Sequence, residues 1–171
     1  MTATPLAVPS DHEFIGLALD EARRAGAEGE VPVGAVVVRA GVVVAAAGNA
    51  RERLADPTAH AEILAMRAAA AALGTWRLDD CTLVVTLEPC AMCAGAAVNA
   101  RIGRVVFGAA DQKAGALGSL YHLASDPRIN HNPPVTHGVR VAECAALLTD
   151  FFAARRASAP RAAAPSAPRP G

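Results

Sequence analysis

The chain has 171 residues, of which 53% are apolar, so it is long enough to fold around one core and is too apolar for a disordered chain. Its 16 basic and 16 acidic residues cancel, which excludes the strongly basic composition of many nucleic-acid-binding proteins. Residues 1–88 nevertheless carry a net charge of −5 and residues 89–171 one of +5, so a locally basic surface is compatible with the sequence.

The first part of the chain predicts an irregular arm, a helix and a β-hairpin. Residues 1–10 contain two prolines and no periodic pattern, which is typical of a flexible arm. Apolar residues at helical spacing predict a helix over 12–26, with Asp11 as its N-cap. Two β-branched runs in 33–48 meet at Ala40-Gly41, which predicts a hairpin.

The middle of the chain alternates predicted helices and strands. A polar loop over 48–58 precedes an alanine-rich helix over 59–74. The apolar run 81–88 predicts a buried strand, and 90–100 predicts a second alanine-rich helix. Another short strand is predicted over 104–108. This alternation indicates a layered α/β fold, and the hairpin makes its sheet mixed rather than all parallel.

The last part of the chain is less regular. Residues 109–136 are rich in loop residues, 139–143 predict a last strand, and 144–156 predict a last helix. Residues 157–171 alternate proline and alanine without large apolar side chains, which predicts a disordered tail. A single folded domain is therefore expected over 11–156.

Neither a signal peptide nor a membrane span is indicated by the sequence. The N-terminus lacks a basic start followed by a long apolar run, and the longest apolar stretches are far below the ~20 residues that a membrane span needs. We therefore expect a cytoplasmic protein without membrane partners, whose four cysteines are reduced thiols or metal ligands.

Two short motifs carry residues suited to metal binding and proton transfer. In AHAEILA, His60 begins a predicted helix and Glu62 follows two residues later. In TLEPCAMCAG, Cys90 and Cys93 are three residues apart at a helix start, so both sulfurs can lie on one face. One imidazole and two thiolates would leave the fourth corner of a tetrahedral zinc site open to water, as in catalytic sites. Glu62 is then free to act as general base and general acid.

Each motif alone has a simpler interpretation. A single histidine at a helix start is usually structural, and a CxxC pair also occurs in redox proteins. The two motifs together, each at the start of a predicted helix, favour a metal site instead. Cys81 and Cys144 have no such neighbours in the sequence and are expected to be buried packing residues.

The combination of His-x-Glu and Pro-Cys-x-x-Cys resembles that of the zinc-dependent nucleoside and nucleobase deaminases. Within that superfamily, residues 12–156 resemble the bacterial tRNA-specific adenosine deaminases, through stretches such as VPVGAVVV, DPTAHAEI and RIGRVVFGAADQKAGALGSL. The resemblance implies a cytidine deaminase-like three-layer α/β/α sandwich with a mixed sheet of about five strands. It also implies hydrolysis of adenosine to inosine at the wobble position of a tRNA anticodon, by a zinc-activated water with a glutamate proton shuttle.

The resemblance assigns roles to particular residues. It implies that His60, Cys90 and Cys93 bind one Zn²⁺ per subunit and that Glu62 moves protons, without an organic cofactor. It implies substrate or RNA contacts for eight further residues: Asn49, Ala61, Asp111, Lys113, Asn130, His131, Phe151 and Phe152. Because members of the family act as homodimers on the anticodon loop, a homodimer and a tRNA partner are expected.

Several alternatives remain compatible with the sequence. Asn49 could be a turn residue and Asp111 a loop-closing residue, while Phe151 and Phe152 could be core residues. A deaminase of free cytosine, guanine or a nucleoside would use the same zinc chemistry without RNA contacts. A zinc-stabilised scaffold without turnover would have no use for Glu62, and its metal would usually have a fourth protein ligand.

Overall fold

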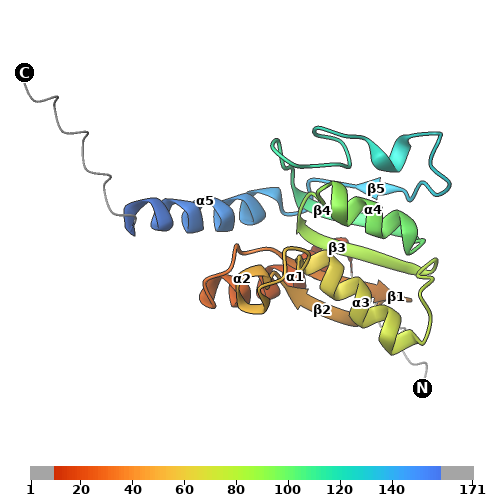
Figure 1. Cartoon of the computed structure of the whole chain (residues 1–171), viewed down its shortest axis with the longest axis horizontal. Helices are drawn as coiled ribbons and strands as arrows, with labels where there is room; N and C mark the ends of the chain where they lie inside the picture. The colour runs from red at the N-terminus through yellow and green to blue at the C-terminus, as the bar shows by residue number, and fades with distance from the viewer. Residues whose placement is uncertain (1–9, 159–171) are drawn as a thin grey trace, which may run out of the picture.

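A computed structural model describes residues 10–158, which form one mixed five-stranded sheet covered by helices on both faces (Figure 1). The spatial order of the strands is β2-β1-β3-β4-β5. The predicted arm, except for its last residue, and the tail beyond Ser158 lie outside the described residues. Within residues 10–158, no helix is long and apolar enough to cross a membrane.

The helices and strands follow one another as the alternating pattern predicts. Their bounds are α1 Asp11–Ala27, β1 Gly34–Arg39, β2 Val42–Gly48, α2 Arg51–Leu54, α3 Ala61–Leu73, β3 Cys81–Leu87, α4 Ala91–Asn99, β4 Arg104–Ala109, the 3₁₀ turn η1 Leu123–Ser125, β5 Val135–Thr136 and α5 Val141–Ser158.

The predicted hairpin is confirmed. Strands β1 and β2 pair antiparallel, and the turn residues Ala40 and Gly41 have φ of 49° and 77°, as both central residues of a type I′ turn require. Strand β1 also pairs antiparallel with β3, whereas β3, β4 and β5 are parallel to one another. The prediction of a mixed sheet is therefore confirmed as well.

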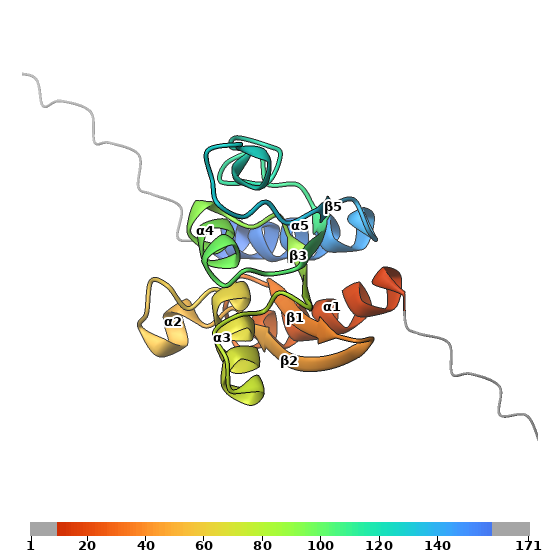
Figure 2. The same ribbon diagram turned by 90° about the vertical axis from the view of Figure 1, so that its right-hand side faces the viewer.

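The two faces of the sheet bury different helices, which gives three layers (Figure 2). One face carries Val37, Leu83 and Val85, which pack with the alanines of α3 and α4. The opposite face carries Val36 and Val84, which pack with α1 and the start of α5. This division follows from the alternation of side chains along a strand. Helix α5 then continues past the sheet edge, and Cys144 is its only buried residue (Figure 1).

Three local predictions need correction. The expected strand 139–143 is wrong, because the edge strand is the two-residue β5, Val135–Thr136, and α5 already begins at Val141. The loop 48–58 contains the short helix α2. The N-cap of α1 is Ser10 rather than Asp11, because Ser10 and Glu13 form a reciprocal capping box.

Candidate metal centre and active site

His60 and Cys90 occupy equivalent positions, since each is the N-cap residue of a helix on the same face of the sheet. The turn before α3 is held by Asp56, whose carboxylate accepts hydrogen bonds from the backbone N–H and the hydroxyl of Thr58 at 2.7 Å. Pro89 separates β3 from α4, which begins at Ala91. Both helices therefore direct their N-terminal ends at the same region.

The three predicted metal ligands lie together. The Nδ1 atom of His60 is 3.7 Å from Sγ of Cys90 and 3.5 Å from Sγ of Cys93. All three donor atoms lie within 4.8 Å of one another. Tetrahedral coordination with Zn–S near 2.3 Å and Zn–N near 2.1 Å separates ligand atoms by about 3.6–3.8 Å. The donor set and its spacing therefore fit zinc.

The cluster already favours the metal-binding form of one of the two cysteines, Cys90. Hydrogen bonds from Cys93 and His60 lower the pKa of Cys90 to about 3. The hydrogen bond to Cys90, together with burial, raises the pKa of Cys93. Cys90 is therefore a thiolate at neutral pH, the form in which cysteine binds metals. The positive ends of α3 and α4 stabilise negative charge at the same place.

Glu62 lies in the first turn of α3 and is nearly inaccessible, with 4% of its surface exposed. Burial raises the pKa of this carboxyl group, while the nearby His60 opposes the shift. Glu62 lines a small inner cavity of about 150 Å³ together with His60 and Cys90. It is thus placed beside the predicted metal ligands without being needed as one of them.

The inner cavity also contains two of the residues assigned to substrate contact. Asn49 is buried and lines the cavity, and Asp111 lies at its rim. The cavity is smaller than the ~300–1,000 Å³ of sites for drug-sized ligands, which suits a group of nucleobase size. Ala61, the first residue of α3, is fully buried in the core and lines neither this cavity nor the groove described next.

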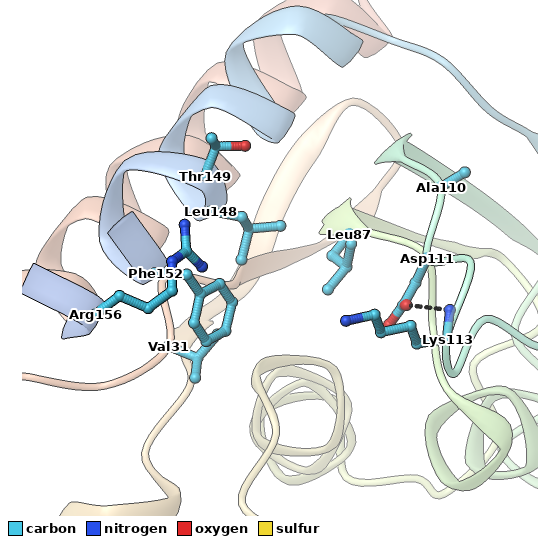
Figure 3. Close-up of a pocket in the computed structure, with 9 residues that line it drawn as sticks. All are labelled: Val31, Leu87, Ala110, Asp111, Lys113, Leu148, Thr149, Phe152 and Arg156. Carbon is cyan, nitrogen blue, oxygen red and sulfur yellow. Dashed lines mark hydrogen bonds between the residues drawn. The ribbon is translucent and has the colours of Figure 1, made fainter. Parts of the chain in front are cut away.

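An outer groove of about 650 Å³ adjoins the cavity and shares Val31, Leu87 and Asp111 with it (Figure 3). Lys113 lies on one side of the groove, in the loop after β4. Phe152 lies on the α5 side and is 42% exposed. Since the outer groove and the inner cavity share three lining residues, an extended ligand bound in the groove has room to place one of its groups in the cavity.

The two phenylalanines of α5 differ in environment. Phe151 is half-buried beneath the guanidinium of Arg155, which lies 5.6 Å from the ring centroid. Phe152 contacts Phe151 edge to face, with centroids 5.4 Å apart, and faces the groove. Phe152 is therefore the member of the pair available to a ligand.

Asn130 and His131 lie away from the cavity and the groove. Arg101 donates hydrogen bonds to the carbonyl and side-chain oxygens of Asn130, at 3.0 and 2.8 Å. The Nε2 atom of His131 lies 2.7 Å from the carbonyl oxygen of Ile102. Both residues thus pack beside the end of α4, and their RNA contacts remain a prediction.

Sequence reasoning missed Glu88, which holds the loop between β4 and η1. Its carboxylate accepts hydrogen bonds from the backbone N–H groups of Asp111, Leu117 and Ser119, all at 3.0 Å, and from the Ser119 hydroxyl. Burial alone would raise the pKa of Glu88, but these hydrogen bonds outweigh it and lower that pKa. Glu88 thereby fixes the loop that carries Asp111 and Lys113.

Comparisons with known proteins point in the same direction as this geometry. Residues 8–109 match the cytidine and deoxycytidylate deaminase zinc-binding region. The chain is 49% identical over 142 residues to the tRNA-specific adenosine deaminase of Bacillus subtilis strain 168, covering 83% of this chain and 88% of that one.

Two solved structures are also similar. A structure from a study of A-to-I editing by tRNA:A34 deaminases at the wobble position has 49% identity and a TM-score of 0.77, covering 80% of this chain and 99% of that one. The guanine deaminase of Nitrosomonas europaea has 26% identity and a TM-score of 0.74, covering 88% of this chain and 89% of that one.

Proposed function

Since this chain belongs to the cytidine and deoxycytidylate deaminase family, we propose that it hydrolyses adenosine to inosine at the wobble position of a tRNA anticodon. The observation that carries the substrate assignment is the outer groove that adjoins the inner cavity. A free base needs only the cavity, whereas a base within RNA needs a surface for the neighbouring nucleotides.

The cations around the site support an RNA substrate. Within residues 10–158, six basic side chains have no acidic partner within ion-pair distance: Arg51, Arg67, Arg101, Lys113, Arg155 and Arg156. Arg51 lines the cavity, and Lys113 and Arg156 line the groove. Unpaired cations beside an exposed aromatic ring are suited to phosphates and splayed bases. The groove lining therefore holds two cations, Lys113 and Arg156, against one carboxylate, Asp111, although the chain is neutral.

The residues divide the chemistry among them. His60, Cys90 and Cys93 would hold zinc, which when bound supplies a Lewis acid that lowers the pKa of water. Glu62 would accept the proton of the attacking water and return it to N1 of adenine. Asn49 would hydrogen-bond the substrate in the cavity. Exclusion of bulk water by the narrow cavity strengthens each of these polar contacts.

Deamination of a free base is the competing function, because the guanine deaminase fold is closely similar. The two functions separate in a position-resolved assay with purified protein and short anticodon stem-loops. We expect inosine in a loop with adenosine at the wobble position, and little in a loop with the adenosine moved by one nucleotide. Conversion of free guanine with both loops unchanged would contradict the proposal.

Removing two groove cations should weaken RNA binding with little effect on chemistry. We expect Lys113→Ala combined with Arg156→Ala to raise KM for the stem-loop by about tenfold while kcat stays near the wild-type value. The slope of log(kcat/KM) against log salt should fall by roughly 1–2 units, since each phosphate contact contributes about 0.7.

The matched control is Arg23→Ala combined with Arg24→Ala, which removes the same charge from α1, where both side chains pair with acidic residues of the same helix. An equal rise of KM in the control would mean that net charge, rather than the groove, guides the RNA.

We infer a cytoplasmic homodimer, as the family resemblance implies. The surface that would support the contact is an apolar groove of about 300 Å³ between α3 and α4, lined by Ile63, Met66, Ala96 and Trp76, which is 61% exposed. Light scattering should give twice the chain mass of 17.4 kDa, and Ala96→Glu should give a monomer. A monomeric wild type at assay concentrations would contradict the inference.

A further inference from the structure

Glu30 is a buried carboxylate to which the proposed chemistry assigns no role. It lies in the loop between α1 and β1 and is 1% exposed. Its Oε1 accepts a hydrogen bond from the backbone N–H of Arg53 at 2.8 Å, and its Oε2 accepts one from Nδ2 of Asn49 at 3.2 Å. Because the N-cap of α2 is Ala50, which has no polar side chain, Glu30 supplies an acceptor that this helix start otherwise lacks.

The contact with Glu30 determines which end of the Asn49 amide faces the inner cavity. A carboxylate has no hydrogen to donate, whereas a side-chain amide has one donor end and one acceptor end. The donor end of Asn49 therefore lies against Glu30. Within residues 10–158, no group donates a hydrogen bond to Oδ1 of Asn49. Every fully buried side-chain nitrogen or oxygen in these residues does have a partner, so Oδ1 is not fully buried and is accessible. Asn49 lines the cavity, and its accessible acceptor is Oδ1.

We propose that Glu30 is a positioning residue that sets the hydrogen-bonding polarity of the cavity by holding Asn49 with its acceptor oxygen toward the substrate. This inference rests on the proposed role of Asn49 in substrate contact. A fixed acceptor favours a substrate group that carries an N–H or O–H at that place. It penalises a group that presents a second acceptor, because two unpaired acceptors would then be buried together.

The E30Q variant inverts this polarity without changing the size of the side chain. The introduced amide must keep its oxygen on the Arg53 amide, because a backbone N–H can only donate. Its NH₂ group therefore faces Asn49, which must turn over and place Nδ2 in the cavity. We expect kcat/KM for the wobble stem-loop to fall by about 10²-fold or more, since a site built for one polarity strongly rejects the other.

The double variant E30Q/N49D separates polarity from packing. Both oxygens of the introduced carboxylate accept hydrogen bonds, so one can accept from the introduced NH₂ group while the other faces the cavity. The pair keeps its total charge and its acceptor toward the substrate. We therefore expect kcat/KM to recover at least about tenfold relative to E30Q. The control is E28Q, which changes an exposed glutamate of the same loop. Oε2 of Glu28 lies 3.1 Å from Nε of Arg53. This variant should have the kcat/KM of the wild type.

A second measurement reports the orientation of Asn49 without any substrate. The side-chain amide resonances of Asn49, identified by their absence in E30Q/N49D, should shift in E30Q, because the bonded partner changes from a carboxylate to an amide. They should remain unchanged in E28Q.

Three results would overturn the role of Glu30. The first is E30Q with wild-type kcat/KM and unmoved Asn49 resonances. The second is an impaired E30Q with unmoved resonances, and the third is an impaired E30Q that N49D does not rescue, as a purely structural role predicts. If the wild type leaves RNA unchanged, the proposed function fails separately. The role of Glu30 is then decided by assaying the same variants on the free base that is deaminated and by the Asn49 resonances.

Discussion

Replacing Glu62 by glutamine should lower kcat on the wobble stem-loop by at least about 10³-fold, because the amide cannot take up and return a proton. The side chain is 4% exposed and lines the cavity beside His60 and Cys90, so bulk water cannot readily replace it as a proton carrier. Zinc content should stay at one ion per chain, since the three ligands are unchanged. Single-turnover rates and metal analysis of the same preparation measure both quantities.

The matched control for this substitution is Glu52→Gln, which changes an exposed glutamate in α2, on the chain segment that precedes α3. It should leave kcat within about twofold of the wild type. If Glu62→Gln retained most of its activity with zinc bound, the proton-transfer role of Glu62 would be wrong. Loss of both zinc and activity would instead make Glu62 part of the metal site.

Replacing Cys93 by alanine should abolish both zinc binding and activity. Cys93 is fully buried and its Sγ lies 3.5 Å from Nδ1 of His60, so alanine at this position leaves the metal with only two of its three predicted ligands. At a zinc concentration a thousandfold above Kd, the metal contributes about 4 kcal/mol to the free energy of unfolding. Its loss should lower Tm by roughly 8–16 °C, and a chelator should lower the Tm of the wild type to a similar extent.

Cys81→Ala serves as the control for this second prediction, because Cys81 is equally buried but lies outside the metal cluster. It should bind zinc normally and lose about 1 kcal/mol of stability from the missing sulfur atom. Full activity of Cys93→Ala without metal would contradict zinc chemistry at this site. Zinc binding by that variant would contradict the assignment of Cys93 as a ligand.

The sequence predicts the centre of the site better than its surroundings. His60, Cys90 and Cys93 lie at helix starts, where residue spacing alone fixes the direction of the side chains. The structure brings these three together with Glu62 as that reasoning requires. The mixed sheet is likewise predictable, because apolar runs alternate with helices and the first two runs meet at the hairpin turn Ala40-Gly41.

Contacts between distant residues are beyond such local reasoning. Glu88 bonds to Ser119 across 31 residues and Glu30 bonds to Asn49 across 19, and neither glutamate lies in a pattern that indicates a partner. The predicted strand over 139–143 is wrong for a related reason. Helix α5 buries only Cys144, so its start lacks the apolar periodicity that would distinguish it from a strand.

The most direct test of the account is a single reaction in ¹⁸O-labelled water that contains the purified protein, a wobble-adenosine stem-loop, and free adenine, guanine and cytosine at equal concentration. We predict that mass spectrometry finds inosine with one ¹⁸O atom in the RNA and one ammonia for each inosine, with the free bases unchanged. Labelled xanthine, hypoxanthine or uracil beside unaltered RNA would contradict wobble deamination, while inosine without the label would contradict hydrolysis by water.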